Sequence, residues 1–142
     1  MKRDPRLHGL SSDHHQALVL ARRVRRRADD ATMDENLATE VGHRYREELR
    51  PHFIVEEEVL LPALEALGEH ALVRRTLEDH AFLASRVEEA ENGALEALAE
   101  FAERLTAHVR FEETELFPAC EASLADGVLD EAARRAPHPP AD

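Results

Sequence analysis

The sequence has little of what β-sheet proteins are built from. Aromatic residues make up only 4% of its 142 residues, there is no tryptophan, and glycine occurs five times. Alanine, leucine, glutamate and arginine, all strong helix formers, dominate instead, and runs rich in β-branched residues are missing. A chain of this length suits one domain with one core. We therefore expect an all-α fold.

Cysteine and long apolar runs are also scarce. The single cysteine, Cys120, cannot form a disulfide within the chain and is expected to be a buried apolar side chain. No apolar run reaches the roughly 18 residues of a membrane span, and the first ten residues lack the apolar centre of a signal peptide. We therefore expect a soluble, cytoplasmic protein without a membrane partner.

Negative charge predominates, with 30 acidic against 18 basic residues and a formal net charge of −12. Such a chain repels nucleic-acid phosphates and anionic lipids. A local run of arginines within residues 22–27 lies on an amphipathic segment, which indicates a solvated helix face. Nucleic acid is therefore not expected as a partner.

Apolar residues recur at intervals of three and four in four successive segments, the spacing of amphipathic helices. These segments run from Leu10 to Ala28, from Leu37 to near Gly68, from Leu72 to Asn92-Gly93, and from Leu95 to Leu116. Ser11, Ser12 and Asp13 are candidate N-caps of the first helix, and Pro51 and Pro62 are expected to kink or tighten the second. Four helices with short connections predict an antiparallel up-down-up-down four-helix bundle.

The bundle is expected to occupy residues 1–123. Residues 124–142 are expected to form a short helix over about residues 128–135 and then a flexible, proline-rich tail that includes His138.

A repeat links the second and fourth helices. The segments HFIVEEEVLLPALE, from His52, and HVRFEETELFPACE, from His108, share the histidine, two glutamates, a leucine, a proline, an alanine and the last glutamate. In each, a glutamate follows the histidine by four residues, Glu56 and Glu112, so both side chains project from one face, which is the apolar one. A carboxylate facing a core is costly unless a partner neutralises it, and a cation between two carboxylates would do so.

The other two helices each place a histidine on their apolar stripe. His14 lies on that of the first helix, whereas His15 points about 100° away and is kept as a substitute ligand. His80 lies on that of the third, flanked by Leu77 and Leu83. Each candidate lies about as far from the connecting turn as its counterpart on the next helix, so all can meet in one layer. The six candidate metal ligands are His14, His52, Glu56, His80, His108 and Glu112.

This set of ligands indicates the metal. Four imidazoles and two carboxylates without a thiolate suit iron or manganese better than structural zinc. Six protein ligands exceed what one open ion needs, and bridging glutamates can hold two ions roughly 3.5 to 4 Å apart. Two iron ions are therefore expected, with manganese or zinc, or a single ion, as alternatives.

Together the motifs resemble a hemerythrin-like, HHE-type cation-binding domain. The resemblance covers about residues 10–123, through DHHQALVLARR, HFIVEEEVLLP, LEDHAFL and HVRFEETELFP. It implies a four-helix bundle that holds a non-haem di-iron centre, oxo- or hydroxo-bridged, with a pocket for dioxygen or nitric oxide. Carried onto this chain, it implies the same six residues as ligands.

The sequence departs from the oxygen carriers of that family in two places. The carriers have two histidines four apart on the third helix, but the residues four before and four after His80 are Thr76 and Ala84. The carriers use an aspartate five residues after the last histidine, where this chain has Glu113, which competes with Glu112 as a ligand. A single histidine on the third helix resembles the bacterial and iron-sensing members, and it leaves an iron with an exchangeable position.

Several neighbouring residues are candidates for supporting roles. Tyr45, seven residues before His52, faces the same side, where its hydroxyl either bonds to the site or is simply the wetted end of a core aromatic. Asp13, Glu57 and Asp79 are expected to accept hydrogen bonds from the second nitrogen of ligating imidazoles, in pairs that the sequence does not assign. The histidines expected to be solvated are His8, His43 and His70.

Three functions are compatible with this pattern. The first is a di-iron protein that binds or responds to dioxygen, nitric oxide, iron or redox state. The second is an enzyme that decomposes peroxide as a catalase does, or uses another oxidant, with no catalytic residue assigned. The third is a structural or partner-binding bundle. A diatomic ligand or peroxide is the expected small partner, a protein or redox partner stays unidentified, and the oligomeric state stays open.

Overall fold

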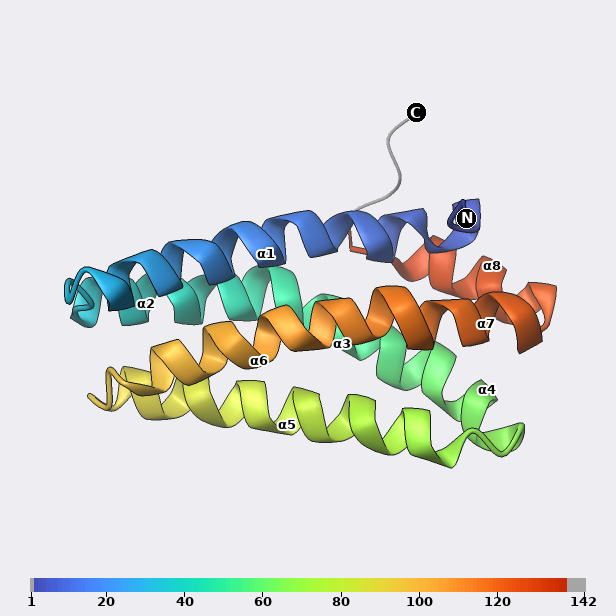
Figure 1. The fold of residues 1–142 in the computed structure, drawn as a ribbon. Helices are drawn as coiled ribbons and strands as arrows, with labels where there is room; N and C mark the ends of the chain where they lie inside the picture. The colour runs from blue at the N-terminus through green and yellow to red at the C-terminus, as the bar shows by residue number, and fades with distance from the viewer. Residues whose placement is uncertain (1, 138–142) are drawn as a thin grey trace.

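The chain forms four long helical rods and a short fifth helix at one end (Figure 1). The computed structural model describes residues 2–137, so the proline-rich end with His138 lies outside the described residues. The elements are η1 (Pro5–Leu7), α1 (His8–Asp29), α2 (Glu35–Arg44), η2 (Tyr45–Leu49), α3 (Arg50–Val55), η3 (Glu56–Leu60), α4 (Leu61–Ala66), α5 (His70–Glu91), α6 (Ala97–Phe111), η4 (Glu112–Leu116), α7 (Phe117–Ser123) and α8 (Asp126–Arg135). α1 is the first rod and α5 the third. The segments from α2 to α4 make the second rod, and those from α6 to α7 the fourth.

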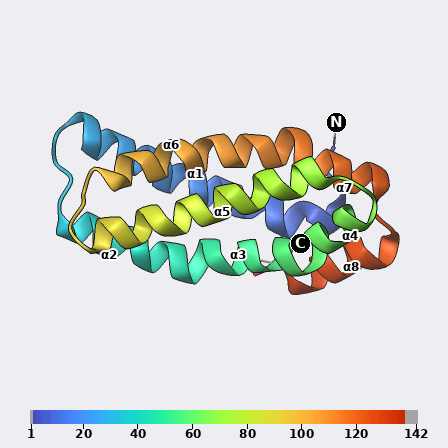
Figure 2. The same cartoon turned by 90° about the horizontal axis from the view of Figure 1, so that it is seen from below.

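The rods are arranged as an antiparallel bundle (Figures 1 and 2). α1 and α5 both pack against α6, and α2 packs against α5. No strand occurs between residues 2 and 137, so the predicted all-α bundle is confirmed. No helix among the described residues is long and apolar enough to cross a membrane.

Three prolines are accommodated by widened turns of π-helix. Pro51, Pro62 and Pro118 each stand at the second position after such a turn, η2, η3 and η4. Proline lacks an N–H and collides with the carbonyl four residues earlier, and a π-turn moves that carbonyl to a partner five residues on. The predicted tightening of the second rod is therefore wrong, because its turns widen, while its continuity from residue 35 to 66 is as expected.

Glycine ends two of the rods, and a capped 3-10 turn begins the first one. Gly68 and Gly93, with φ of +88° and +109°, end the second and third rods in the left-handed conformation that glycine adopts without strain. The predicted N-caps of the first helix are wrong, since α1 begins at His8 and Ser11, Ser12 and Asp13 lie inside it. A 3-10 turn capped by the Asp4 carboxylate precedes it and starts the helix earlier than the apolar pattern indicates.

The apolar core is divided into two clusters along the bundle. One, around Phe101 and Leu105, fills the half near the α1–α2 turn, and the other, around Leu60 and Phe117, fills the half near the N-terminus. On α1 and α5 the buried polar residues fall between the positions that belong to the two clusters, and on the second and fourth rods they flank the boundary between the clusters. The polar layer therefore crosses the middle of the bundle.

The end nearest the N-terminus is closed by α8. This helix packs against η1 and η3, and its Leu129 and Ala132 are buried in the same cluster as Leu7. Cys120 is buried in that cluster as well, as expected. Arg3 ties the N-terminal segment down through Glu121, 2.8 Å away.

One leucine of the apolar stripe predicted on α5 is exposed to solvent and not buried. Leu77 is 43% exposed, because it lies at the margin of α5 over an open groove between this helix and the second rod. Leu83, two turns further along, is 0% exposed. The two leucines therefore form a matched pair on one helix.

We expect Leu83→Ala to lower the free energy of unfolding by about 2–5 kcal/mol, because it leaves a cavity in the core. Leu77→Ala is expected to cost about 1 kcal/mol or less, because water already reaches that side chain. Urea unfolding of both variants measures the difference. Equal losses would contradict the placement of Leu77.

Candidate metal centre

All six predicted ligands lie together in the buried polar layer. Glu56 and Glu112 are 0% exposed, and none of the four histidines exceeds 6%. They come from all four rods: His14 from α1, His52 and Glu56 from the second, His80 from α5, and His108 and Glu112 from the fourth. This layer is where the structure places the entire predicted set.

The six residues form two groups that share the glutamates. His14 and His52 join Glu56 and Glu112 in one group, and His80 and His108 join the same two glutamates in the other. Within each group one ligand atom per residue lies within 4.8 Å of the others. Such an arrangement suits two metal ions bridged by two carboxylates.

The Nε2 atoms of all four imidazoles point toward these two carboxylates. His14 Nε2 lies 2.7 Å from Glu112 Oε1, and His80 Nε2 lies 3.0 Å from Glu56 Oε1. His52 Nε2 lies 2.8 Å from Glu56 Oε2, and His108 Nε2 lies 3.0 Å from Glu112 Oε2. The ring nitrogens therefore converge on the space between the glutamates.

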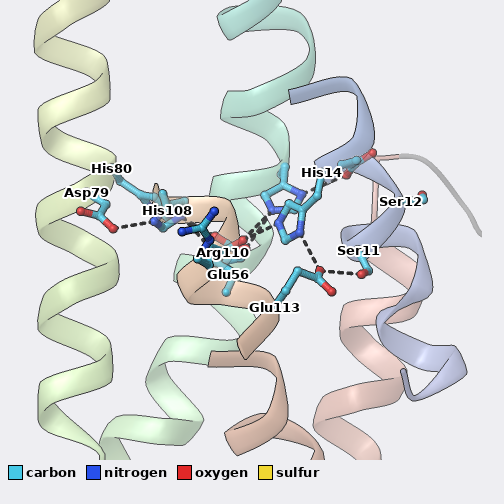
Figure 3. A network of polar contacts seen from close by, with 12 residues as sticks. Ser11, Ser12, His14, Glu56, Asp79, His80, His108, Arg110 and Glu113 are labelled. Atoms are coloured by element: carbon cyan, nitrogen blue, oxygen red, sulfur yellow. Dashed lines mark hydrogen bonds and ion pairs between the residues drawn. The ribbon is translucent and has the colours of Figure 1, made fainter. Parts of the chain in front are cut away.

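The Nδ1 atoms all point away from that space, each to a carboxylate. Two of the Nδ1 pairs are His14 with Glu113 and His108 with Asp79, both at 2.7 Å (Figure 3). The other two are His52 with Asp13 at 3.0 Å and His80 with Glu57 at 2.6 Å. Such partners fix the ring orientation and leave the lone pair of Nε2 for a metal.

These pairs repeat between the two halves of the chain. In each half an Asp-His dipeptide, at 13–14 and 79–80, faces a His-x-x-x-Glu-Glu motif, at 52–57 and 108–113. Each aspartate binds the motif histidine of its own half. Glu57 holds His80 and Glu113 holds His14, so the second glutamate of each motif reaches the other half. The repeated Asp-His dipeptide is a sequence signal for these pairs, and Glu113, predicted as a competitor of Glu112, lies at His14 Nδ1.

Three buried atoms of the centre lack a hydrogen-bond partner among the described residues. They are Glu56 Oε2, Glu112 Oε2 and His108 Nε2. Their nearest counterparts lie at hydrogen-bonding distance but are not aligned for a hydrogen bond. Buried polar atoms are almost always satisfied, and a cation between these atoms would satisfy all three. The residues present therefore fit a metal.

Comparison with known proteins agrees with this geometry. Residues 6–120 match the family model described as the hemerythrin HHE cation binding domain. The chain belongs to the hemerythrin HHE cation-binding family. No curated protein and no solved structure matches this hemerythrin domain significantly. Its family and its two His/Glu groups together identify it as a cation-binding domain.

Charge in the metal-free hemerythrin domain is balanced by protons on imidazole. Burial by itself lowers the pKa of His108, but the charge and close contact of Glu112 and the hydrogen bond to Asp79 outweigh it and raise the pKa to about 10. The pKa values of His14 and His52 are raised in the same way against burial by their carboxylate partners. Burial raises the pKa of Glu112, but His108 and its other partners hold it well below its usual range.

The shared glutamates begin two of the π-turns. Glu56 is the first residue of η3 and Glu112 the first of η4, and each carbonyl accepts a hydrogen bond from the residue five positions on. The π-turns therefore begin at the two ligand candidates that both groups share. π-turns inside α-helices are frequent at functional sites.

A small cavity borders the centre on the side away from α8. Its volume is about 10 Å³, roughly the space of one water molecule. Its apolar walls are Ala17, Leu49, Phe53, Leu105 and Val109, and its polar walls are Asp13, His14, His52, His108 and Glu112. We name this space the inner cavity. It touches ligand candidates of both groups.

The remaining candidates lie outside the centre. His15 is exposed, as are His8, His43 and His70, of which His70 pairs with Glu65. The Tyr45 ring packs on Phe53, with centroids 6.4 Å apart, and burial raises its pKa. Within residues 2–137 its hydroxyl makes no hydrogen bond, so the structure supports a core aromatic and not a hydroxyl bonded to the site.

The pKa of His108 makes the stability of the metal-free protein depend on pH. The folded state binds this proton with a pKa of about 10 and the unfolded chain with about 6.5, so the stabilisation is complete below pH 6.5 and is lost as pH rises toward 10. We expect the urea midpoint of the metal-free protein to fall over this range, and to fall less in His108→Gln, which lacks the proton. A midpoint that stays constant in the parent would contradict the charge balance described here.

Proposed function

We propose that this hemerythrin domain is a non-haem di-iron protein that binds or responds to a small uncharged ligand, dioxygen or nitric oxide. The observation that carries the proposal is the pair of His/Glu groups that share Glu56 and Glu112 and border the inner cavity. Two ions with shared carboxylates give each ion a similar set of donors, and the adjoining cavity gives a ligand a place beside them.

The donor set favours iron. Each group offers two imidazoles and two shared carboxylates, a nitrogen and oxygen set that suits iron or manganese. A thiolate is absent from both groups, and burial raises the pKa of Cys120 to about 12, so this thiol stays protonated in the core. When bound, a pair of iron ions supplies exchangeable coordination positions and electrons for a small oxidant.

The third rod, α5, supplies only one imidazole, His80, to the group formed by His80, His108 and the two shared glutamates. Thr76, four residues before His80, is 0% exposed, but its hydroxyl donates to the Leu72 carbonyl at 2.8 Å. Ala84, four residues after His80, is exposed. Neither side chain supplies a further donor to the group, which supports an exchangeable position there.

The protein surroundings select for small ligands. Apolar clusters cover the centre on both sides along the bundle and exclude bulk water. The inner cavity has a volume of about 10 Å³, which favours a diatomic molecule over an organic substrate. The carboxylates at Nδ1 hold the imidazoles in place while a ligand exchanges.

Metal content per chain tests the proposed centre. After anaerobic loading with ferrous iron and desalting, the parent is expected to retain two irons. His108→Ala and His14→Ala, each in one group only, are expected to retain about one iron or less, and Glu112→Ala, which is in both, close to none.

His15→Ala is the matched control, since His15 neighbours His14 but is exposed, and it is expected to retain two irons. One iron or none in the parent would overturn the di-iron proposal while leaving the fold intact. Equal iron content in His14→Ala and His15→Ala would remove His14 from the ligands.

Ligand binding is tested on the iron-loaded protein. Anaerobic titration with nitric oxide is expected to change the visible spectrum with a fixed stoichiometry, and removal of the gas to restore it. Sustained decomposition of many equivalents of hydrogen peroxide, lost in Glu112→Ala, would instead favour an enzyme. No spectral change with either reagent would contradict both functions.

A further inference from the structure

A second small cavity adjoins the inner one. Its volume is also about 10 Å³, and it is lined by Asp13, Gln16, Ala17, Leu20, Arg44, Glu48 and Leu49. Asp13, Ala17 and Leu49 line the inner cavity as well. We name the second space the outer cavity and these three shared residues the neck.

The outer cavity lies in the seam between α1 and η2. One wall is α1, and the other belongs to the rod segment whose turn is widened before Pro51. Gln16 is exposed, and the half-buried side chains of Arg44 and Glu48 form an ion pair beside it. The outer cavity therefore lies next to solvent, whereas the inner one lies among the ligand candidates.

We propose that this seam is the path by which the small ligand reaches the metal centre, and that Ala17 and Leu49 set the size limit at its neck. The inference rests on the proposed function, because it assigns a path to the ligand of that centre. Each cavity is about the size of one water molecule, so the path favours the smallest ligands, such as diatomic molecules, over organic ones.

The chemistry of the neck favours an uncharged ligand. Two of its three residues, Ala17 and Leu49, present only hydrocarbon and are 3% and 6% exposed. The third, Asp13, is a carboxylate held by His52. No cationic side chain lines the neck, so an anion would meet an apolar constriction beside a negative group. Dioxygen and nitric oxide fit this environment.

A wider groove on the other side of the second rod borders His80 but does not share the inner cavity. It has a volume of about 420 Å³ and runs between α5 and the second rod, where Leu77 and Ala84 line it. Phe53 separates it from the inner cavity, since its ring lines both spaces, is 4% exposed and stacks on His80 at 3.9 Å. The groove therefore meets the centre only at the stacked rings of Phe53 and His80, whereas the seam meets the inner cavity.

Two opposite changes at the neck test the path. In the iron-loaded protein, Leu49→Ala is expected to raise the association rate of nitric oxide by roughly tenfold, and Ala17→Val to lower it by roughly tenfold, measured by stopped flow. Ala84→Val, an identical change in the groove, is expected to leave the rate within about twofold of the parent.

Unchanged rates in both neck variants, or a slower rate only in Ala84→Val, would overturn the proposal. The two neck variants act in opposite directions, so impaired folding of Ala17→Val cannot imitate the expected pattern. If Ala17→Val does not fold, the nitric oxide association rate of Leu49→Ala alone decides the test.

A second measurement separates the path from the metal chemistry. Dissolved dioxygen at raised pressure speeds nuclear relaxation of nearby methyl groups, here in the full chain kept free of paramagnetic metal. The methyls of Ala17 and Leu49, 3% and 6% exposed, are expected to relax several times faster than those of Leu60 and Leu64, which are also buried, at 0% exposed. Equal relaxation would overturn the path. Fast relaxation at the neck in a chain whose iron form binds no nitric oxide would keep the path and refute the proposed function.

Discussion

Glu56 and Glu112 have no exposure to solvent, and the rest of the structure must supply the partners that these two carboxylates need. A buried carboxylate is stable only where cations and hydrogen-bond donors replace water around it. Here one imidazole from each rod does so, and each imidazole is held in turn by a further carboxylate. Because the partners come from four rods, this condition brings all four to one level and divides the apolar core into two clusters.

The two halves of the centre are alike in their ligands and different in their surroundings. At His14 the supporting Glu113 also accepts a hydrogen bond from Ser11 (Figure 3). It accepts another from Arg3, which ties it to the N-terminal segment. At His80 the supporting Glu57 has a side chain that is 41% exposed and borders the open groove. The side chain of Glu113 is 33% exposed but is held by two further donors, so the two His/Glu groups have similar donor sets in different surroundings.

Proline has a structural part in this arrangement. The three π-turns each precede a proline, and two of them begin at the shared glutamates. A proline two positions after the turn prevents the ordinary bond of an α-helix and favours the wider one. The third turn, η2, forms one side of the seam at Leu49. The same local chemistry therefore shapes the rods next to the ligands and beside the small cavities.

The sequence alone determined the four rods, their order and the six residues of the buried layer, because helical periodicity places residues three and four apart on one face and only the polar residues on that face need a buried partner. The tertiary structure alone decided which carboxylate holds which imidazole, since Asp13 and His52, or Glu113 and His14, lie on different rods and meet only when these pack. It also decided that Leu77 is exposed, because that depends on how far α5 stands from the second rod. Periodicity reports the face of one helix, and the distance between two helices is set by the side chains of both.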